Sequence, residues 1–248
     1  MDELSHRQAK ILAAIVKLNC EGNMPVASRD LVEKFDFGLS SATIRNEMAD
    51  LEKMGYIRQP HTSAGRVPTD EGFRYFVNQL MDRVKLTMRE QENLRSEILQ
   101  LQAINADLGR RIAKVLSAHT AQASFAVFPE EISTVGLGKV LDNPALPSED
   151  AREIAEFFDN IDEYADDMLT NYGDKEPTAF IGKELKLSKR SDYTMIVTGV
   201  ELQGGKKGVI GLIGPKAMQY QKNISLMEYI TKLIGGGTAV ILLFLITK

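Results

Sequence analysis

The polar side chains best suited to recognition chemistry lie between residues 40 and 52. Ile44, Met48 and Leu51 are spaced as i, i+4 and i+7, which predicts a helix that buries all three. Other residues near its N-terminal end then face outward, namely Ser41, Thr43, Arg45 and Asn46. Arginine can hydrogen-bond guanine O6 and N7, asparagine can bond adenine N6 and N7, and the helix N-terminus with the Ser40 hydroxyl can hold a phosphate. The segment therefore predicts a DNA recognition helix.

A second set of candidate DNA-binding residues follows in a hairpin-like segment. Two strand-like runs, 56–59 and 66–68, enclose a loop of small and polar residues at 60–65. The segment supplies cations and small donors, namely Arg58, His61, Thr62, Ser63 and Arg66. Such a tip can lie along the DNA backbone or enter the minor groove. Helix and hairpin together predict a winged helix-turn-helix, and a generic three-helix domain with solvated polar residues is the alternative.

No grouping that predicts catalysis or a cofactor is found. Cys20 is the single cysteine, and the three histidines, His6, His61 and His119, are far apart in the sequence. An acidic stretch lacks the central glycine of a calcium loop and is more typical of a solvated helix face: Asp159, Asp162, Glu163, Asp166 and Asp167. We therefore expect a protein that is not an enzyme and that binds neither a cofactor nor a metal.

Charge and hydropathy limit the class of protein further. The net charge is −4, and residues 1–80 hold ten Lys/Arg against eleven Asp/Glu, so DNA affinity must come from where the cations lie. The N-terminus lacks the pattern of a signal peptide, and a lone cysteine suits a reducing compartment. The apolar run 239–246 is shorter than the roughly 18 residues of a membrane span and favours a strand over a membrane contact. A cytoplasmic protein is expected.

The elements that position these residues divide the chain into three parts. Residues 1–77 are predicted to form the DNA-binding domain, with a first helix ending near Gly22 and a second beginning at an N-cap, Ser28. Residues 78–118 form one heptad-like run without glycine or proline until Gly109, which predicts a long helical connector. Residues 119–248 are predicted to form a smaller α/β domain.

The connector also predicts a dimer contact. Its apolar seam includes Leu94, Ile98, Leu101, Asn105, Leu108 and Ile112, and a buried asparagine would fix the register of two paired helices. Packing of the seam on the chain's own C-terminal part is the alternative. We favour the dimer contact, because two-fold symmetry in a protein matches an inverted repeat in DNA.

Strand patterns dominate after Pro177. Residues 178–181, 193–202 and 207–213 are predicted strands, Gly204 and Gly205 form a turn, and a helix over 219–233 covers the sheet. No convergent polar cluster specifies a ligand, so an interaction surface is favoured over a small-molecule pocket. The fold class is therefore α+β.

The amino-acid sequence of two blocks resembles that of a known family. Residues 38–52, continuing through 55–57 and 59–69, and later 208–215 with Met218 and Tyr220, closely resemble the heat-inducible transcription repressor HrcA family; residues 136–141 do so more weakly. The resemblance implies a reduced GAF-like fold for the C-terminal domain. Compared with the family, 120–136 has little of the material of the early strands, and Lys216, Ala217 and Gln219 replace the usual Thr, Arg and Asp.

The same resemblance implies a function. Family members repress chaperone operons by binding an inverted-repeat operator, the CIRCE element, as homodimers, with activity modulated by the GroEL chaperonin. The expected function is thus negative regulation of heat-shock transcription. The alternative hypothesis is a winged-helix adaptor of the chaperone system that docks on proteins and does not bind DNA sequence-specifically. The acidic net charge favours this alternative.

Overall fold

The computed structural model divides into two compact units, and it describes residues 4–62, 64–102, 107–142, 147–185, 192–202 and 205–235. Unit 1 comprises Met1–Asp82 together with the later segment Lys216–Tyr220, and unit 2 comprises Arg83–Pro215 and Gln221–Lys248. The expected final strand over 239–246 lies outside the described residues.

Unit 1 begins with three helices, α1 (His6–Gly22), α2 (Ser28–Lys34) and α3 (Ser41–Lys53). A capping box between Ser5 and Gln8 starts α1, and Asn23 ends it in the left-handed conformation with φ 49°, which asparagine tolerates. The cap predicted at Ser28 is wrong by one residue: the backbone N–H of Ala27, before α2, donates to the Asp30 carboxylate at 2.8 Å.

A small sheet and two short helices complete unit 1. Strands β1 (Ile57–Arg58) and β2 (Val67–Pro68) pair antiparallel, and Val26 bridges Arg66 beside them. The helix α4 (Asp70–Tyr75) continues into a π-helical turn, η1 (Phe76–Leu80). Buried side chains from α1, α3, β1 and α4 form the core of the unit, including Ile11, Ile44, Leu51, Ile57 and Phe73.

Unit 2 is built on a five-stranded antiparallel sheet in the order β4-β3-β7-β6-β5. The strands are β3 (Ala123–Phe128), β4 (Glu131–Val135), β5 (Thr178–Ile181), β6 (Tyr193–Glu201) and β7 (Lys207–Pro215). Gly205, with φ 80°, lies in the turn between β6 and β7, and Gly204 lies outside the described residues. Contrary to the expected lack of early strands, residues 120–136 form β3 and β4, and β3 lies inside the sheet.

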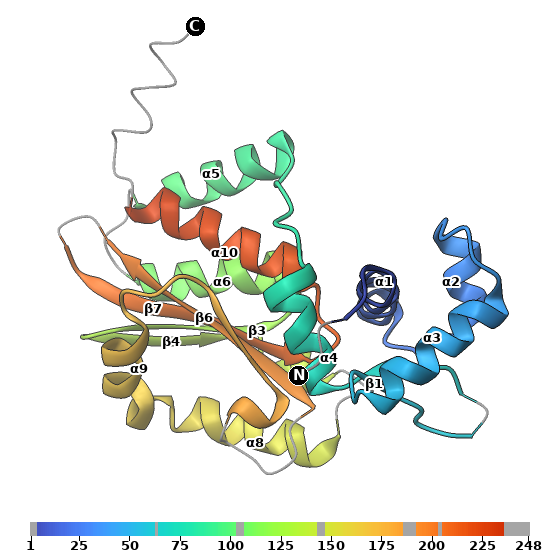
Figure 1. Ribbon diagram of the computed structural model, residues 1–248. Coiled ribbons are helices and arrows are strands. Elements are labelled where there is room, and N and C mark those ends of the chain that lie inside the picture. Colours follow the sequence, from blue (N-terminus) through green and yellow to red (C-terminus); the bar gives the residue numbers. More distant parts are fainter. Residues whose placement is uncertain are drawn as a thin grey trace, which may run out of the picture. The chain divides into compact units, whose positions relative to one another are not determined.

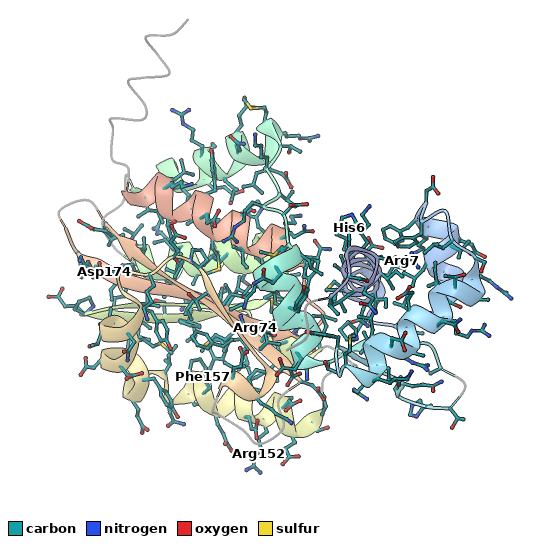
Figure 2. All side chains as sticks on the ribbon, in the orientation of Figure 1. His6, Arg7, Arg74, Arg152, Phe157 and Asp174 are labelled. Carbon is teal, nitrogen blue, oxygen red and sulfur yellow. The ribbon has the colours of Figure 1, made fainter. Side chains whose placement is uncertain are left out.

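Helices cover both faces of this sheet (Figure 1). On one face lie α5 (Met88–Gln102), α6 (Leu108–Thr120) and α10 (Tyr220–Gly235), and the Ser124 hydroxyl donates to the Ala113 carbonyl of α6 at 2.6 Å. On the other lie α7 (Leu137–Leu141), α8 (Ser148–Asp159), η2 (Ile161–Tyr164) and α9 (Ala165–Tyr172). Phe157 points from α8 toward the sheet (Figure 2). Its ring packs edge-on against that of Phe125 of β3, with 5.9 Å between the ring centroids. A further short helix, η3 (Gly182–Leu185), follows β5.

The connector is not the single helix that its pattern predicts. Residues 81–87 are non-helical, and a capping box formed by Thr87 and Glu90 starts α5 afresh. Between α5 and α6, Asp107 has φ 60° and so ends any continuous helix before Leu108. Because neither break contains glycine or proline, the heptad pattern alone did not reveal them.

Candidate nucleic-acid interface

Helix α3 presents its two base-recognition candidates to solvent. Ile44, Met48 and Leu51 are buried, which confirms the predicted inward face. Arg45 and Asn46 are exposed, and the structure gives their side chains no hydrogen bond or ion pair within the described part of the chain. The two side chains are therefore free to meet a ligand without breaking an existing contact.

The small hydroxyl residues at the start of α3 already have structural roles. Ser40 is the N-cap: its Oγ accepts from the Thr43 backbone N–H at 3.1 Å and lies 2.9 Å from the Thr43 hydroxyl. The Ser41 hydroxyl lies 2.9 Å from that of buried Ser28, which ties α2 to α3. These contacts fix the N-terminal turn of α3, and a hydroxyl can still accept a further bond.

Glu52, near the end of α3, organises the hairpin. Its carboxylate accepts from the Gln59 backbone N–H at 2.9 Å and from Arg66 Nε at 2.9 Å. The Arg66 guanidinium, predicted as a DNA contact, is thus held by α3, with a side chain 21% exposed. Sequence reasoning did not single out Glu52 or Gln59, because the i, i+7 and longer separations from α3 into a hairpin have no local signature.

The loop between the two strands is closed by the Gln59 side chain and by backbone pairing of Arg66 with Val26. Gln59 Nε2 donates to the carbonyls of Thr62 and Ala64, both at 3.0 Å. Arg66 and Val26 exchange two backbone hydrogen bonds at 2.8 Å, and a Cβ on Gly65 would lie 2.4 Å from the Val26 oxygen. Arg58, His61 and Thr62 are exposed, and Ser63 lies outside the described residues. The loop is therefore a shaped element that offers polar side chains outward.

Three carboxylates of α3 are each compensated by a cation. Arg7, labelled on α1 in Figure 2, contacts Glu47 at 3.1 Å. Lys53 contacts Asp50 at 2.8 Å, and Arg66 contacts Glu52 at 2.9 Å. Phosphates approaching α3 would thus meet neutralised carboxylates, while Arg45 and Arg58 remain uncompensated within the described residues. This pairing explains how a segment of slightly negative charge can present local positive charge.

The predicted dimer seam is largely core. Leu94, Ile98 and Ile112 are at most 2% exposed in the single chain, so the expectation that they pack on a second copy is wrong, and the alternative of intramolecular packing holds for them. Leu108 is half-buried. Nothing is described of the Leu101 side chain, and Asn105 lies outside the described residues.

Outside this interface, few of the described side chains could react or bind a metal. Burial raises the pKa of Cys20 to about 12, and the five residues of the acidic stretch are exposed. No set of three or more metal-ligating side chains gathers among the described residues. An open cavity of about 390 Å³ near the end of β6 has a lining of mixed charge, including Lys175, Glu201, Glu228 and Lys232.

The structure belongs to a class of two-unit proteins that combine a helical N-terminal unit with a mixed unit of helices and an antiparallel sheet. A crystal structure titled as that of a hypothetical protein has the same fold, with a TM-score of 0.69 at 21% sequence identity over 94% of this chain and 97% of that one. This likeness concerns the fold alone.

Sequence comparison gives the family. The model of the HrcA protein C-terminal domain matches residues 68–224, and the chain belongs to the HrcA family. The heat-inducible transcription repressor HrcA of Acetivibrio thermocellus is 44% identical over 132 residues, which are 53% of this chain and 38% of that protein. The protein of the same name from Carboxydothermus hydrogenoformans is 45% identical over 127 residues, 51% of this chain and 37% of that protein. The matched part is thus less than half of either relative.

Within the described part of the chain, no helix is long and apolar enough to cross a bilayer.

Proposed function

We propose that the chain is a transcription repressor that binds an inverted-repeat DNA operator through unit 1. The observation that carries the proposal is the outward face of α3, where exposed Arg45 and Asn46 have no protein partner among the described residues and the neighbouring carboxylates are compensated. The names of the curated relatives, heat-inducible transcription repressors, support the same role.

In this proposal unit 1 is a winged helix-turn-helix. Arg45 and Asn46 hydrogen-bond base edges in the major groove, and the α3 N-terminus with Ser40, Ser41 and Thr43 lies against a phosphate. Arg58, His61, Thr62 and Ser63 contact the backbone or the minor groove from the loop. Arg66 acts mainly by holding the hairpin on Glu52, so its removal weakens binding through the shape of the loop.

The proposal extends to assembly and control. A homodimer in the cytoplasm presents two copies of α3 to the two half-sites, and unit 2, a reduced GAF-like domain, supplies the interaction surface on which the GroEL chaperonin modulates activity. The buried seam residues leave dimerisation to surfaces other than Leu94, Ile98 and Ile112.

A titration of purified protein against DNA tests the operator proposal. Fluorescence anisotropy on an inverted repeat and on a scrambled duplex of equal composition, at several salt concentrations with and without chaperonin, should show tighter binding to the repeat. Equal binding to both duplexes under all conditions would refute sequence-specific repression. Chaperonin capture by a protein that binds neither duplex would instead support the adaptor hypothesis.

A further inference from the structure

The connection between β7 and α10 is part of unit 1, although β7 and nearly all of α10 belong to unit 2. Strand β7 ends at Pro215, helix α10 begins at Tyr220, and the segment Lys216–Tyr220 is assigned to unit 1. A chain segment more than 130 residues beyond Asp82 therefore completes the unit that carries α3.

This segment is packed and not a loose linker. Lys216 Nζ donates to Asp70 Oδ1 at 2.6 Å, with side chains 19% and 26% exposed. The ring of Tyr220, 1% exposed, lies 5.8 Å from that of Phe73 between centroids. Met218 is buried as well. Each contact is made by side chains whose burial limits alternative positions.

The partners of the segment lie on α4, which supports the point where α3 meets the hairpin. Thr69, the N-cap of α4, donates from Oγ1 to the Gly55 carbonyl at 2.6 Å, and its backbone N–H donates to the Tyr56 carbonyl at 3.0 Å. A Cβ on Gly72 would lie 2.1 Å from the Tyr56 oxygen, so α4 lies directly against the backbone between α3 and β1. Asp70 lies in the same helical turn as Thr69 and Gly72, so a shift of Asp70 would also move the contacts of α4 with Gly55 and Tyr56.

We propose that the segment Lys216–Tyr220 couples unit 2 to the DNA-binding surface, with Lys216 as a positioning residue that acts through Asp70 on α4. An event that displaces β7 or α10 pulls on this segment and alters the setting of α3 and the hairpin. By thermodynamic reciprocity, DNA bound at α3 must also alter β7 and α10. The inference rests on the proposed function for its DNA readout, while the state of α4 can be measured without DNA.

The chain offers a control ion pair of equal length but greater exposure at the other end of the same strand, with side chains 51% and 77% exposed. Lys207 begins β7 and contacts Asp174 at 2.6 Å, the same distance as Lys216 to Asp70, but within unit 2. The test compares Lys216→Met with Lys207→Met by hydrogen exchange, with and without the inverted-repeat duplex. The peptides to follow are 53–58, 70–75, 207–215 and 221–235. In wild type and in Lys207→Met, the duplex should slow exchange in the two unit 2 peptides.

In Lys216→Met the duplex should leave the unit 2 peptides unchanged, and affinity should fall roughly three- to thirty-fold, the range of mutations that alter coupling. The charge-swapped pair Asp70→Lys with Lys216→Asp should restore the response, which assigns the effect to this ion pair. An unchanged response in Lys216→Met, or an equal loss in Lys207→Met, overturns the coupling.

If no duplex binds wild type, the proposed function fails, and the free proteins decide the inference. Lys216→Met must then speed exchange at both 53–58 and 70–75, and Lys207→Met must not. Equal exchange of the two variants at these peptides would refute the role of Lys216 independently of DNA.

Discussion

Arg45 and Asn46 differ from three other polar candidates of unit 1, because within the described part of the chain they make no side-chain hydrogen bond or ion pair that a bound ligand would have to break. Ser40 caps its helix, Ser41 ties two helices together and Arg66 holds the hairpin. In these three cases, a side chain that could bind a phosphate or a base already makes a hydrogen bond that stabilises the fold. Sequence patterns rank such residues together, and only the three-dimensional contacts separate them.

Arg45→Ala and Asn46→Ala should each lower operator affinity by about 1–3 kcal/mol and relax base preference at one position, because each removes hydrogen bonds to a base edge. Anisotropy on single-base variants of the repeat measures both effects. The control for charge alone is Lys53→Ala, which leaves Asp50 uncompensated and should weaken binding to every duplex alike. A change in base preference in Lys53→Ala equal to that in Arg45→Ala would contradict base recognition by Arg45.

The Cys20 thiol should be inert in the folded protein. Its pKa is about 12 against an ordinary 9.0, chiefly through burial and then through Glu21, so its thiolate fraction near pH 8 falls by about 1,000-fold. The unfolded thiol ionises first, so this group lowers stability as pH rises from about 9 to 12. Thiol titration with a chromogenic disulfide in buffer and in urea checks this. Rapid labelling of native protein would show that α1 does not bury the thiol.

At the level of elements, the sequence predicted those whose pattern is local. The strands expected over 178–181, 193–202 and 207–213 and the inward face of α3 are confirmed by the structure. Strand β3 was missed because all six of its residues are buried and no alternation marks it. The breaks in the connector depend on tertiary contacts such as the burial of Leu86, although the Thr87–Glu90 capping box was a readable signal.

The hairpin depends on the close approach of Gly65 to Val26. Gly65→Ala should destabilise unit 1 by about 1–3 kcal/mol, since a Cβ 2.4 Å from the Val26 oxygen must break the bridge between Val26 and Arg66. Gly138→Ala is the contrast, because its Cβ would meet no atom within 4 Å and alanine favours the helix α7. Thermal unfolding compares them, and equal midpoints for the two variants would refute the steric argument.

At the scale of the whole molecule, the buried seam residues should contribute to folding stability and not to the oligomeric state. Leu94→Ala should destabilise unit 2 by roughly 2–5 kcal/mol through the cavity that it leaves. It should leave the oligomeric state unchanged under conditions where the protein is folded. Urea unfolding together with light scattering after gel filtration measures both quantities. A shift from dimer to monomer with unaltered stability would instead return Leu94 to a dimer interface.

Division into two units also limits what sequence order can predict. The DNA-binding domain was expected to end at residue 77, whereas Phe73 packs against Tyr220, far along the chain. Neither residue carries a sign of the other in its local pattern. Such a contact follows only from the path of the backbone through β7.

The return of residues 216–220 to unit 1 has a consequence for synthesis. A ribosome adds roughly 5–20 residues per second, and N-terminal parts of a chain generally fold first. Here the first unit lacks Met218 and Tyr220 until the sheet of the second unit has been translated. A truncated chain released before residue 220 would leave Phe73 without the ring of Tyr220, so the first unit of an incomplete product would be less stable.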